Sequence, residues 1–151
     1  SNEEDRKLCH DLGAEVVVNH RHEHWEMDVL TKTNGMKIDR VIDVEFGKNL
    51  PKLLKVLNTG ATITTYASSQ VPNPELPFLQ MMYMDLSIKM VIVYAMPEEA
   101  KSDAIKDITA ALKNDQLQHR VTHVLPLKEI NRSHQLIESG NVRGCVILTL
   151  D

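Results

Sequence analysis

The sequence predicts an α/β fold built on a parallel sheet. Segments with strand character alternate with helical segments of about ten residues, in the order αβαβαβαβα followed by βαβ. Two of the strand segments contain almost no polar residue, which is typical of strands covered on both faces. With 151 residues, 42% of them hydrophobic, the chain can bury a core without disulfides or a metal.

The composition excludes several classes of function. Seventeen Lys and Arg against 21 Asp and Glu give a net charge of −4, whereas a general nucleic-acid binder carries a basic face. The longest apolar run, residues 90–96, suits a buried strand and is too short to span a bilayer, so no membrane partner is expected. Cys9 and Cys145 lie far apart in the sequence, which favours a reducing, cytoplasmic setting.

The amino-terminal segment predicts a helix and then a strand. Ser1 and Glu4 have the spacing of a capping box, and Gly13 lies where the helix ends, because glycine adopts positive φ at low cost. The β-branched run at residues 14–19 follows as a buried strand. Apolar residues at helical spacing predict the next helix over residues 25–33.

The middle of the chain continues the alternation. Residues 39–44 form the next predicted strand. In the helix that follows, Asn49 caps the amino end, Pro51 lies in the first turn and Gly60 marks the end. Residues 61–66 then form a third strand, rich in Thr and Ile.

Three prolines separate this region from the remaining elements, because proline removes a hydrogen-bond donor and restricts φ. They predict a loop over residues 67–77. The further predicted elements are a Met-rich helix at 78–86, a strand at 87–95, a long helix opened by Pro97, and a tail with a strand at 120–125, a helix at 128–139 and a strand at 145–150.

Ligands of parallel α/β sheets bind outside the carboxyl ends of the strands. The candidate positions are therefore those that follow each strand: Asn19-His20, Glu45-Phe46, Tyr66-Ala67-Ser68 and Val93-Tyr94-Ala95. Asp43 and Glu45 share a strand face and could form an acid–base pair, although an ordinary strand end fits them as well. His20, His22 and His24 alternate and could bind Zn or Ni, but a polar loop is the commoner reading of such a cluster.

Three motifs resemble one enzyme family in order and spacing. They are SNEEDRKLCHDLGAEVVVNH, then DRVIDVEFGKNL with VLNTGATITTYAS, and finally THVLPLKEINRSHQLIESGNVRGCVIL. Together they are similar to the carboxyl-terminal part of medium-chain dehydrogenases/reductases, in particular the zinc-independent quinone oxidoreductase (zeta-crystallin-like) branch. The resemblance implies a partial Rossmann fold, a doubly wound parallel sheet that lacks its first two strands, in residues 1–118. Residues 119–151 would be a βαβ tail that returns to the substrate domain.

The resemblance also implies an enzymatic function, but this sequence contains only some of the motifs on which that function depends. The six glycines, at positions 13, 35, 47, 60, 140 and 144, form no G-x-G-x-x-G phosphate loop. The family implies a carboxyl-terminal fragment of an NADPH-dependent quinone or enone oxidoreductase with a small-molecule substrate. We expect no catalytic residue and no metal ligand in this chain, and no activity in isolation. The alternative is a non-catalytic module for oligomerisation or nucleotide binding.

The family assigns the adenosine side of the cofactor to the start of the chain. Ser1, Asn2 and Arg6 occupy the segment that contacts the 2′-phosphate. Asp5 stands where the family usually has Lys and would repel a phosphate, so Arg6 either replaces that contact or belongs to a solvated helical turn. NADP is the expected cofactor, with NAD left open. His20 takes the place of a ring near the adenosine ribose.

The nicotinamide side of the cofactor maps to the later strand ends. The loop of Glu45 touches the cofactor through backbone groups in the family. The other implied contacts are Tyr66, Ala67 and Ser68 near the nicotinamide-side ribose, and Val93 and Tyr94 near the carboxamide.

The absence of two strands leads to a prediction about assembly. In the doubly wound order, residues 14–19 would be the third strand and residues 39–44 the fourth. The two missing strands would leave a gap of roughly 10–15 Å at ~4.8 Å per strand spacing. Unpaired strand edges favour association. We therefore expect a homodimer, through the edge of strand 87–95 that the family uses or by re-pairing of strands.

Overall fold

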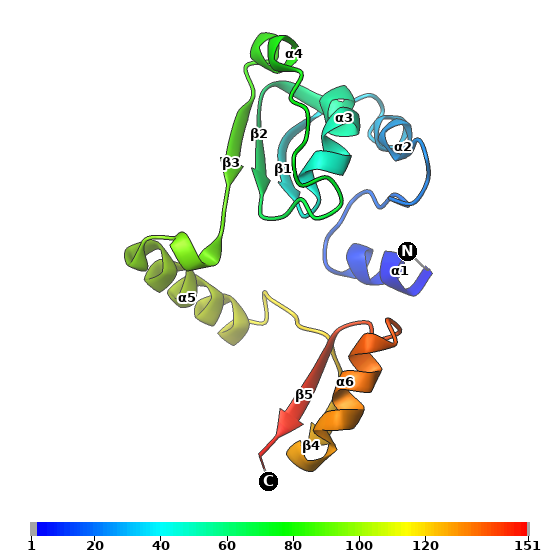
Figure 1. Ribbon diagram of the computed structural model, residues 1–151. Helices are drawn as coiled ribbons and strands as arrows, with labels where there is room; N and C mark the ends of the chain where they lie inside the picture. The colour runs from blue at the N-terminus through cyan, green and yellow to red at the C-terminus, as the bar shows by residue number, and fades with distance from the viewer. Residues whose placement is uncertain (1–2, 151) are drawn as a thin grey trace. The chain divides into compact units, whose positions relative to one another are not determined.

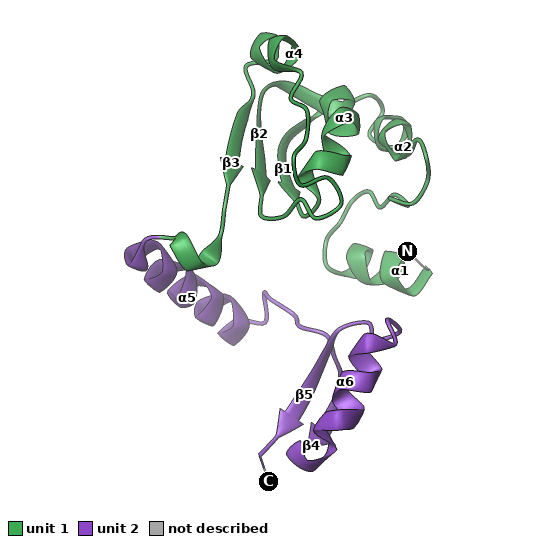
Figure 2. Ribbon diagram, in the orientation of Figure 1, with its two compact units in different colours: residues 1–96 green, residues 97–151 purple. Residues whose placement is uncertain are grey.

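A computed structural model describes residues 3–150, and the chain forms two compact units, residues 1–96 and 97–151 (Figure 2). The first unit contains α1 (Glu3–Asp11), α2 (Trp25–Lys32), β1 (Ile38–Asp43), α3 (Phe46–Val56), β2 (Leu57–Thr65), α4 (Phe78–Tyr83), β3 (Ser87–Met90) and the 3₁₀ turn η1 (Val93–Ala95). The second contains α5 (Glu98–Lys113), β4 (Val121–Pro126), the 3₁₀ turn η2 (Leu127–Glu129), α6 (Ile130–Glu138) and β5 (Cys145–Thr149).

A parallel sheet in the order β1-β2-β3 organises the first unit (Figure 1). Val41 of β1, Ile63 of β2 and Ile88 of β3 are aligned across it. The predicted α/β fold with parallel strands is confirmed. Because parallel neighbours need long connections, α3 and α4 occupy the crossovers between these strands.

The core of this unit lies between α3 and one face of the sheet. Helix α3 carries leucines at helical spacing, and its buried residues form one cluster with the start and middle of β2. The members are Phe46, Leu50, Leu53, Leu54, Val56, Leu57, Ala61 and Ile63. The opposite face is not fully covered, since Ile42 of β1 is 82% exposed.

Residues 14–19 do not form the predicted strand. They have no regular structure, although Lys32 donates a hydrogen bond from its Nζ to the Val17 carbonyl. Within residues 3–150, β1 pairs with β2 and has no strand on its other side. Strand propensity alone does not satisfy backbone hydrogen bonds, so the valine run stays irregular without a neighbouring strand.

Helix α3 begins and ends earlier than predicted. It starts at Phe46 after Glu45, and the Asn49 side chain donates from Nδ2 to Asp43 Oδ1 (2.8 Å) instead of capping the helix. Its end at Val56 leaves Gly60 inside β2, where the pairing with β1 is irregular and Gly60 has φ +79°. The glycine therefore permits a bulge and not a helix end.

The strand predicted over residues 87–95 ends at Met90. The Val91 N–H still donates to the Thr65 carbonyl (2.9 Å), and Val93 and Tyr94 lie in η1. Strand β2 stops at Thr65, so no ladder partner exists for the last residues of the apolar run. Tyr94 is 86% exposed, which corrects the expectation of a buried strand here.

The second unit contains a small parallel pair. β4 pairs with β5, and α6 connects and packs against them, as the predicted βαβ tail requires. The apolar residues Ile105 and Ile108 of α5 are exposed. The predicted boundary between residues 118 and 119 lies inside this unit and stays a prediction. No helix within residues 3–150 has the length and apolar character to cross a bilayer.

An ion pair between a buried glutamate and a lysine that is 58% exposed joins α2 to α3 in the first unit. Glu26 is 1% exposed, and its Oε1 accepts a hydrogen bond from Lys55 Nζ (2.9 Å). This hydrogen bond holds the pKa of the Glu26 carboxyl below its ordinary value of 4.5. Glu26 Oε2 is buried without a hydrogen-bond partner, and among the groups that stabilise the buried charge the hydrogen bond from Lys55 has the largest effect on its pKa.

We predict that Lys55→Met destabilises the protein most at neutral pH. Because the folded-state pKa of Glu26 lies below the unfolded one, the pair contributes fully above the unfolded pKa and is lost as the pH falls through the folded value. The difference in Tm between wild type and variant should therefore shrink below pH 4.5. Lys101→Met, which removes an exposed pair with Glu98, is the control and should have little effect at any pH. A constant Tm difference from pH 7 into acid would contradict this role of Glu26.

Candidate functional site

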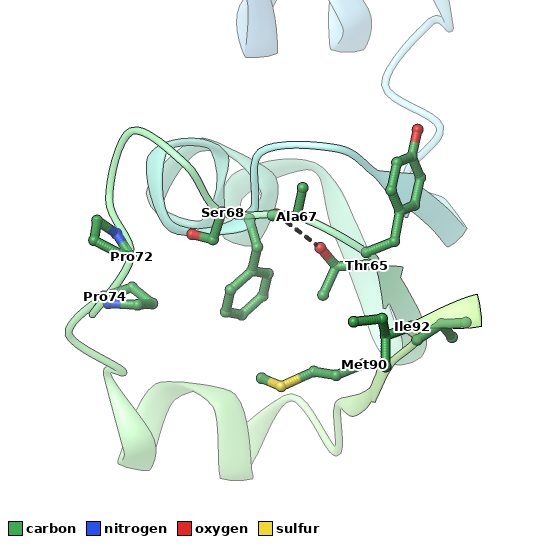
Figure 3. Close-up of a pocket in the computed structure, with 10 residues that line it drawn as sticks. Thr65, Ala67, Ser68, Pro72, Pro74, Met90 and Ile92 are labelled. Carbon is green, nitrogen blue, oxygen red and sulfur yellow. Dashed lines mark hydrogen bonds between the residues drawn. The ribbon is translucent and has the colours of Figure 1, made fainter. Parts of the chain in front are cut away.

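A cavity of about 300 Å³ opens at the carboxyl ends of β2 and β3 (Figure 3). Its wall is formed by Thr65–Ser68 at the end of β2, by Met90–Ile92 at the end of β3, and by Phe46, Pro72 and Pro74. Figure 3 shows the two prolines on one side of the cavity and Met90 with Ile92 on the other. This is the edge of the sheet at which the parallel topology places ligands.

The polar side chains in the cavity wall include two hydroxyls that are already bonded within the protein. Thr65 Oγ1 donates to the carbonyl of Ala67 (3.3 Å). Ser68 Oγ accepts from the N–H of Gly47 (2.9 Å) and donates to the carbonyl of Val71 (2.6 Å). The wall therefore presents mainly apolar surface to a ligand, and orientation would depend on backbone groups.

The loop after β2 is bonded to the first turn of α3. The Phe46 N–H donates to the Ala67 carbonyl (3.0 Å), beside the bond from Gly47 to Ser68. The first N–H groups of a helix have no partner inside the helix, so this loop satisfies them. One side of the cavity is thus fixed by the start of α3.

Glu45 and Lys48 extend this attachment to the tip of the loop. The Glu45 carboxylate accepts from the N–H of Ser69 at Oε2 (3.2 Å) and from the N–H of Gln70 at Oε1 (2.8 Å). Lys48 Nζ donates to Gln70 Oε1 (2.5 Å). The side chains that flank the helix start therefore hold residues 69 and 70 directly.

Asp43 anchors the other side of the helix start. It is 5% exposed, and its Oδ1 accepts from the Glu45 N–H (3.3 Å) and from Asn49 Nδ2 (2.8 Å). These bonds explain why the chain turns directly from β1 into α3. They favour the reading of Asp43 as an ordinary strand end over an acid–base pair with Glu45.

The sequence agrees with one family along almost its whole length. A profile described as zinc-binding dehydrogenase matches residues 12–148. The chain belongs to the zinc-binding dehydrogenase family. No curated protein matches the chain.

Solved structures of medium-chain alcohol dehydrogenases and quinone oxidoreductases share the fold. An NAD-dependent alcohol dehydrogenase is 25% identical with a TM-score of 0.77, and the match covers 100% of this chain and 42% of the dehydrogenase chain. A mycobacterial quinone oxidoreductase is 22% identical with a TM-score of 0.84, over 98% of this chain and 46% of its own. CurA from Vibrio vulnificus, in complex with NADPH, is 18% identical with a TM-score of 0.76, over 100% and 48%. The chain therefore spans less than half the length of each of these proteins.

The structure brings together part of the predicted site. Glu45 lies at the start of α3 and is bonded to the loop that begins with Tyr66, Ala67 and Ser68. Val93 and Tyr94 follow the cavity wall in the chain but do not belong to it. The remaining predicted residues lie on other segments: Arg6 on α1 in an ion pair with Glu3 (3.5 Å), His20 in the exposed turn before α2, and Ser1 and Asn2 outside the described residues.

The cavity also contains residues that the sequence alone did not assign to it. Met90 and Ile92 belong to a run read as a buried strand, and Pro72 and Pro74 to a loop without a role. Gly47 is the most informative of the overlooked positions, because the loop packs directly on it. Its place one residue after the helix start could have indicated a close contact with another segment, since a glycine allows close approach of a neighbouring backbone.

The family's name implies zinc, but the described residues do not fit a zinc site. Residues 3–150 contain no group of three His, Cys, Asp or Glu side chains placed to hold a metal ion. In the histidine cluster, His22 Nδ1 is hydrogen-bonded to Asp28 Oδ2 (2.7 Å), and the rings of His22 and His24 lie 6.4 Å apart. We assign no zinc ligand among residues 3–150.

We predict that Gly47→Ala displaces the cavity loop. A Cβ at this position would overlap the Val71 carbonyl oxygen and lie 2.8 Å from Ser68 Oγ, so the variant should lose about 1–3 kcal/mol of stability. Cleavage by the Glu-specific protease Glu-C after Glu75, in the same loop, should become faster below the unfolding temperature. Thermal unfolding and the cleavage rate measure the two effects.

The matched control is Gly35→Ala. An added methyl group meets nothing within 4 Å there, but φ is +80°, so only a backbone cost of about 1 kcal/mol is expected. Cleavage after Glu75 should match wild type. If Gly47→Ala and wild type are cleaved at equal rates, the loop does not depend on close approach to Gly47.

Proposed function

We propose that this chain is the carboxyl-terminal part of an NADPH-dependent quinone or enone oxidoreductase of the zinc-independent, zeta-crystallin-like branch. The observation that carries the proposal is the family match combined with a cavity at the carboxyl ends of β2 and β3. Related structures include an NADPH complex and an NAD-dependent enzyme, so NADP is the favoured cofactor and NAD the second choice. Two free, exposed cysteines suit a reducing cytoplasm.

The proposed role of this chain is to position the cofactor. NADP(H), when bound, supplies the hydride, and the protein supplies orientation and a dry cleft. Tyr66, Ala67 and Ser68 would contact the nicotinamide-side ribose. Because the Ser68 hydroxyl is bonded to Gly47 and Val71, its contact would use backbone groups. The apolar wall around Phe46 would keep water from the ring.

The other proposed contacts lie on segments beyond the cavity wall. Val93 and Tyr94 would meet the carboxamide through their backbone, and His20 would lie near the adenosine ribose. Ser1, Asn2 and Arg6 would contact the 2′-phosphate. None of these residues is assigned a catalytic role, since the substrate would bind between this chain's sheet and a further domain.

A second candidate function is assembly without catalysis. It is favoured by the free edge of β1, which has no second neighbour within residues 3–150, and by Ile42, which is 82% exposed. The sequence also contains no G-x-G-x-x-G motif, so this chain offers no glycine-rich loop of that kind to bind the phosphates of a dinucleotide, and this favours assembly as well. In this case the sheet would serve to join two copies.

A thermal-shift titration with NADPH separates these two functions. We expect the Tm to rise, with a stabilisation of about 1.4 kcal/mol once the ligand reaches ten times its Kd, because NADPH would bind only the folded state. We also expect no NADPH oxidation with a quinone present. A flat titration up to millimolar NADPH would favour assembly, and turnover proportional to protein concentration would contradict the proposed inactivity.

We further propose that the chain forms a homodimer, through the β3 edge or by re-pairing of strands. Light scattering after size exclusion should give twice the chain's 17.1 kDa. Ile42→Lys on β1 and Met90→Lys on β3 replace exposed residues (82% and 71%) and place a charge at one edge each. The edge that pairs is the one whose variant becomes monomeric, and a monomeric wild type would overturn the proposal.

A further inference from the structure

We infer that Glu45 is a positioning residue whose carboxylate holds the loop over residues 67–74 in the shape that forms the cavity. The inference deepens the proposed function, on which it rests for the identity of the ligand. It assigns Glu45 to the support of the site and not to contact with the cofactor. The reasons lie in where the two carboxylate oxygens point and in what else holds the loop.

Both oxygens of Glu45 are occupied by the loop. Oε2 accepts from the Ser69 N–H and Oε1 from the Gln70 N–H, at 3.2 and 2.8 Å. Hydrogen bonds to an ionised acceptor are stronger than those between neutral groups. Two successive backbone N–H groups therefore bind one carboxylate, and the side chain is turned toward the loop.

The position of Glu45 at the start of α3 makes this arrangement specific. It is the N-cap residue, yet its side chain makes no capping hydrogen bond to its own helix. Its N–H is held by Asp43 Oδ1, which fixes the backbone from which the side chain extends. The positive end of the helix dipole lies beside the carboxylate and attracts its charge. The carboxylate thus links the helix start to a loop more than 20 residues away in the chain.

The base and the tip of the loop are held by different groups. Backbone N–H groups of Phe46 and Gly47 bind Ala67 and Ser68 at the base. At residues 69 and 70 the holding groups are the side chains of Glu45 and Lys48. Removing the Glu45 charge should therefore leave the base intact and loosen the tip. Pro72 and Pro74, which line the cavity, follow that tip directly.

The test is amide hydrogen exchange in the folded chain, compared among three variants. Glu45→Gln keeps the shape of the side chain but turns an NH₂ group toward one of the two N–H donors. Exchange at Ser69 and Gln70 should become about tenfold faster or more, while that at Phe46 and Gly47 stays unchanged. Glu45→Asp keeps the charge but is one methylene shorter, and should show the same local effect. Glu75→Gln, at an exposed glutamate one residue beyond this loop, is the matched control and should exchange like wild type.

NADPH titration of the same variants tests the link to the ligand. Glu45→Gln should raise the Kd about tenfold, and Glu75→Gln should leave it unchanged. Unchanged exchange at Ser69 and Gln70 in Glu45→Gln would overturn the inference, as would faster exchange with an unchanged Kd. If wild type binds no NADPH, the proposed function fails. The exchange rates still decide whether Glu45 holds the loop, because they require no ligand.

Discussion

The first unit depends on how the backbone N–H groups at the start of α3 are satisfied. Phe46 and Gly47 have no intrahelical acceptor, and the loop after β2 supplies the Ala67 carbonyl and the Ser68 hydroxyl. This requirement brings two segments about twenty residues apart into contact at the carboxyl edge of the sheet. The cavity exists because the loop is held here and then turns away through Pro72 and Pro74.

The same sheet is incomplete on its β1 side. A parallel strand needs hydrogen-bonding neighbours, and most parallel sheets are covered on both faces. In the described part of the chain, β1 pairs only with β2, and Ile42 is exposed. The valine run at residues 14–19 has strand composition but no strand to pair with, and it remains irregular. The chain shares its fold with 42% of a solved alcohol dehydrogenase structure, and within residues 3–150 its β1 edge has no second strand.

In the candidate site, the residues that hold the loop and the helix start in place differ from the apolar wall that faces the cavity. Asp43 Oδ1 and the Ser68 hydroxyl are bonded to backbone groups and, for Asp43, also to Asn49, while Asp43 Oδ2 is buried without a hydrogen-bond partner. Both carboxylate oxygens of Glu45 accept hydrogen bonds from backbone N–H groups. The remaining wall is mostly apolar. This arrangement suits a cofactor that carries its own chemistry, since the protein then has to orient it and exclude water.

The sequence by itself determined the α/β alternation, the parallel strands and the family, because periodicity, β-branched runs and motif order are local properties of the chain. It also located Tyr66, Ala67 and Ser68 at the carboxyl edge of a strand. Tertiary structure alone decided that residues 14–19 stay irregular, that β3 ends at Met90 and that Glu45 binds the loop. These outcomes depend on which backbone groups find partners across the fold, and local composition does not encode the partner.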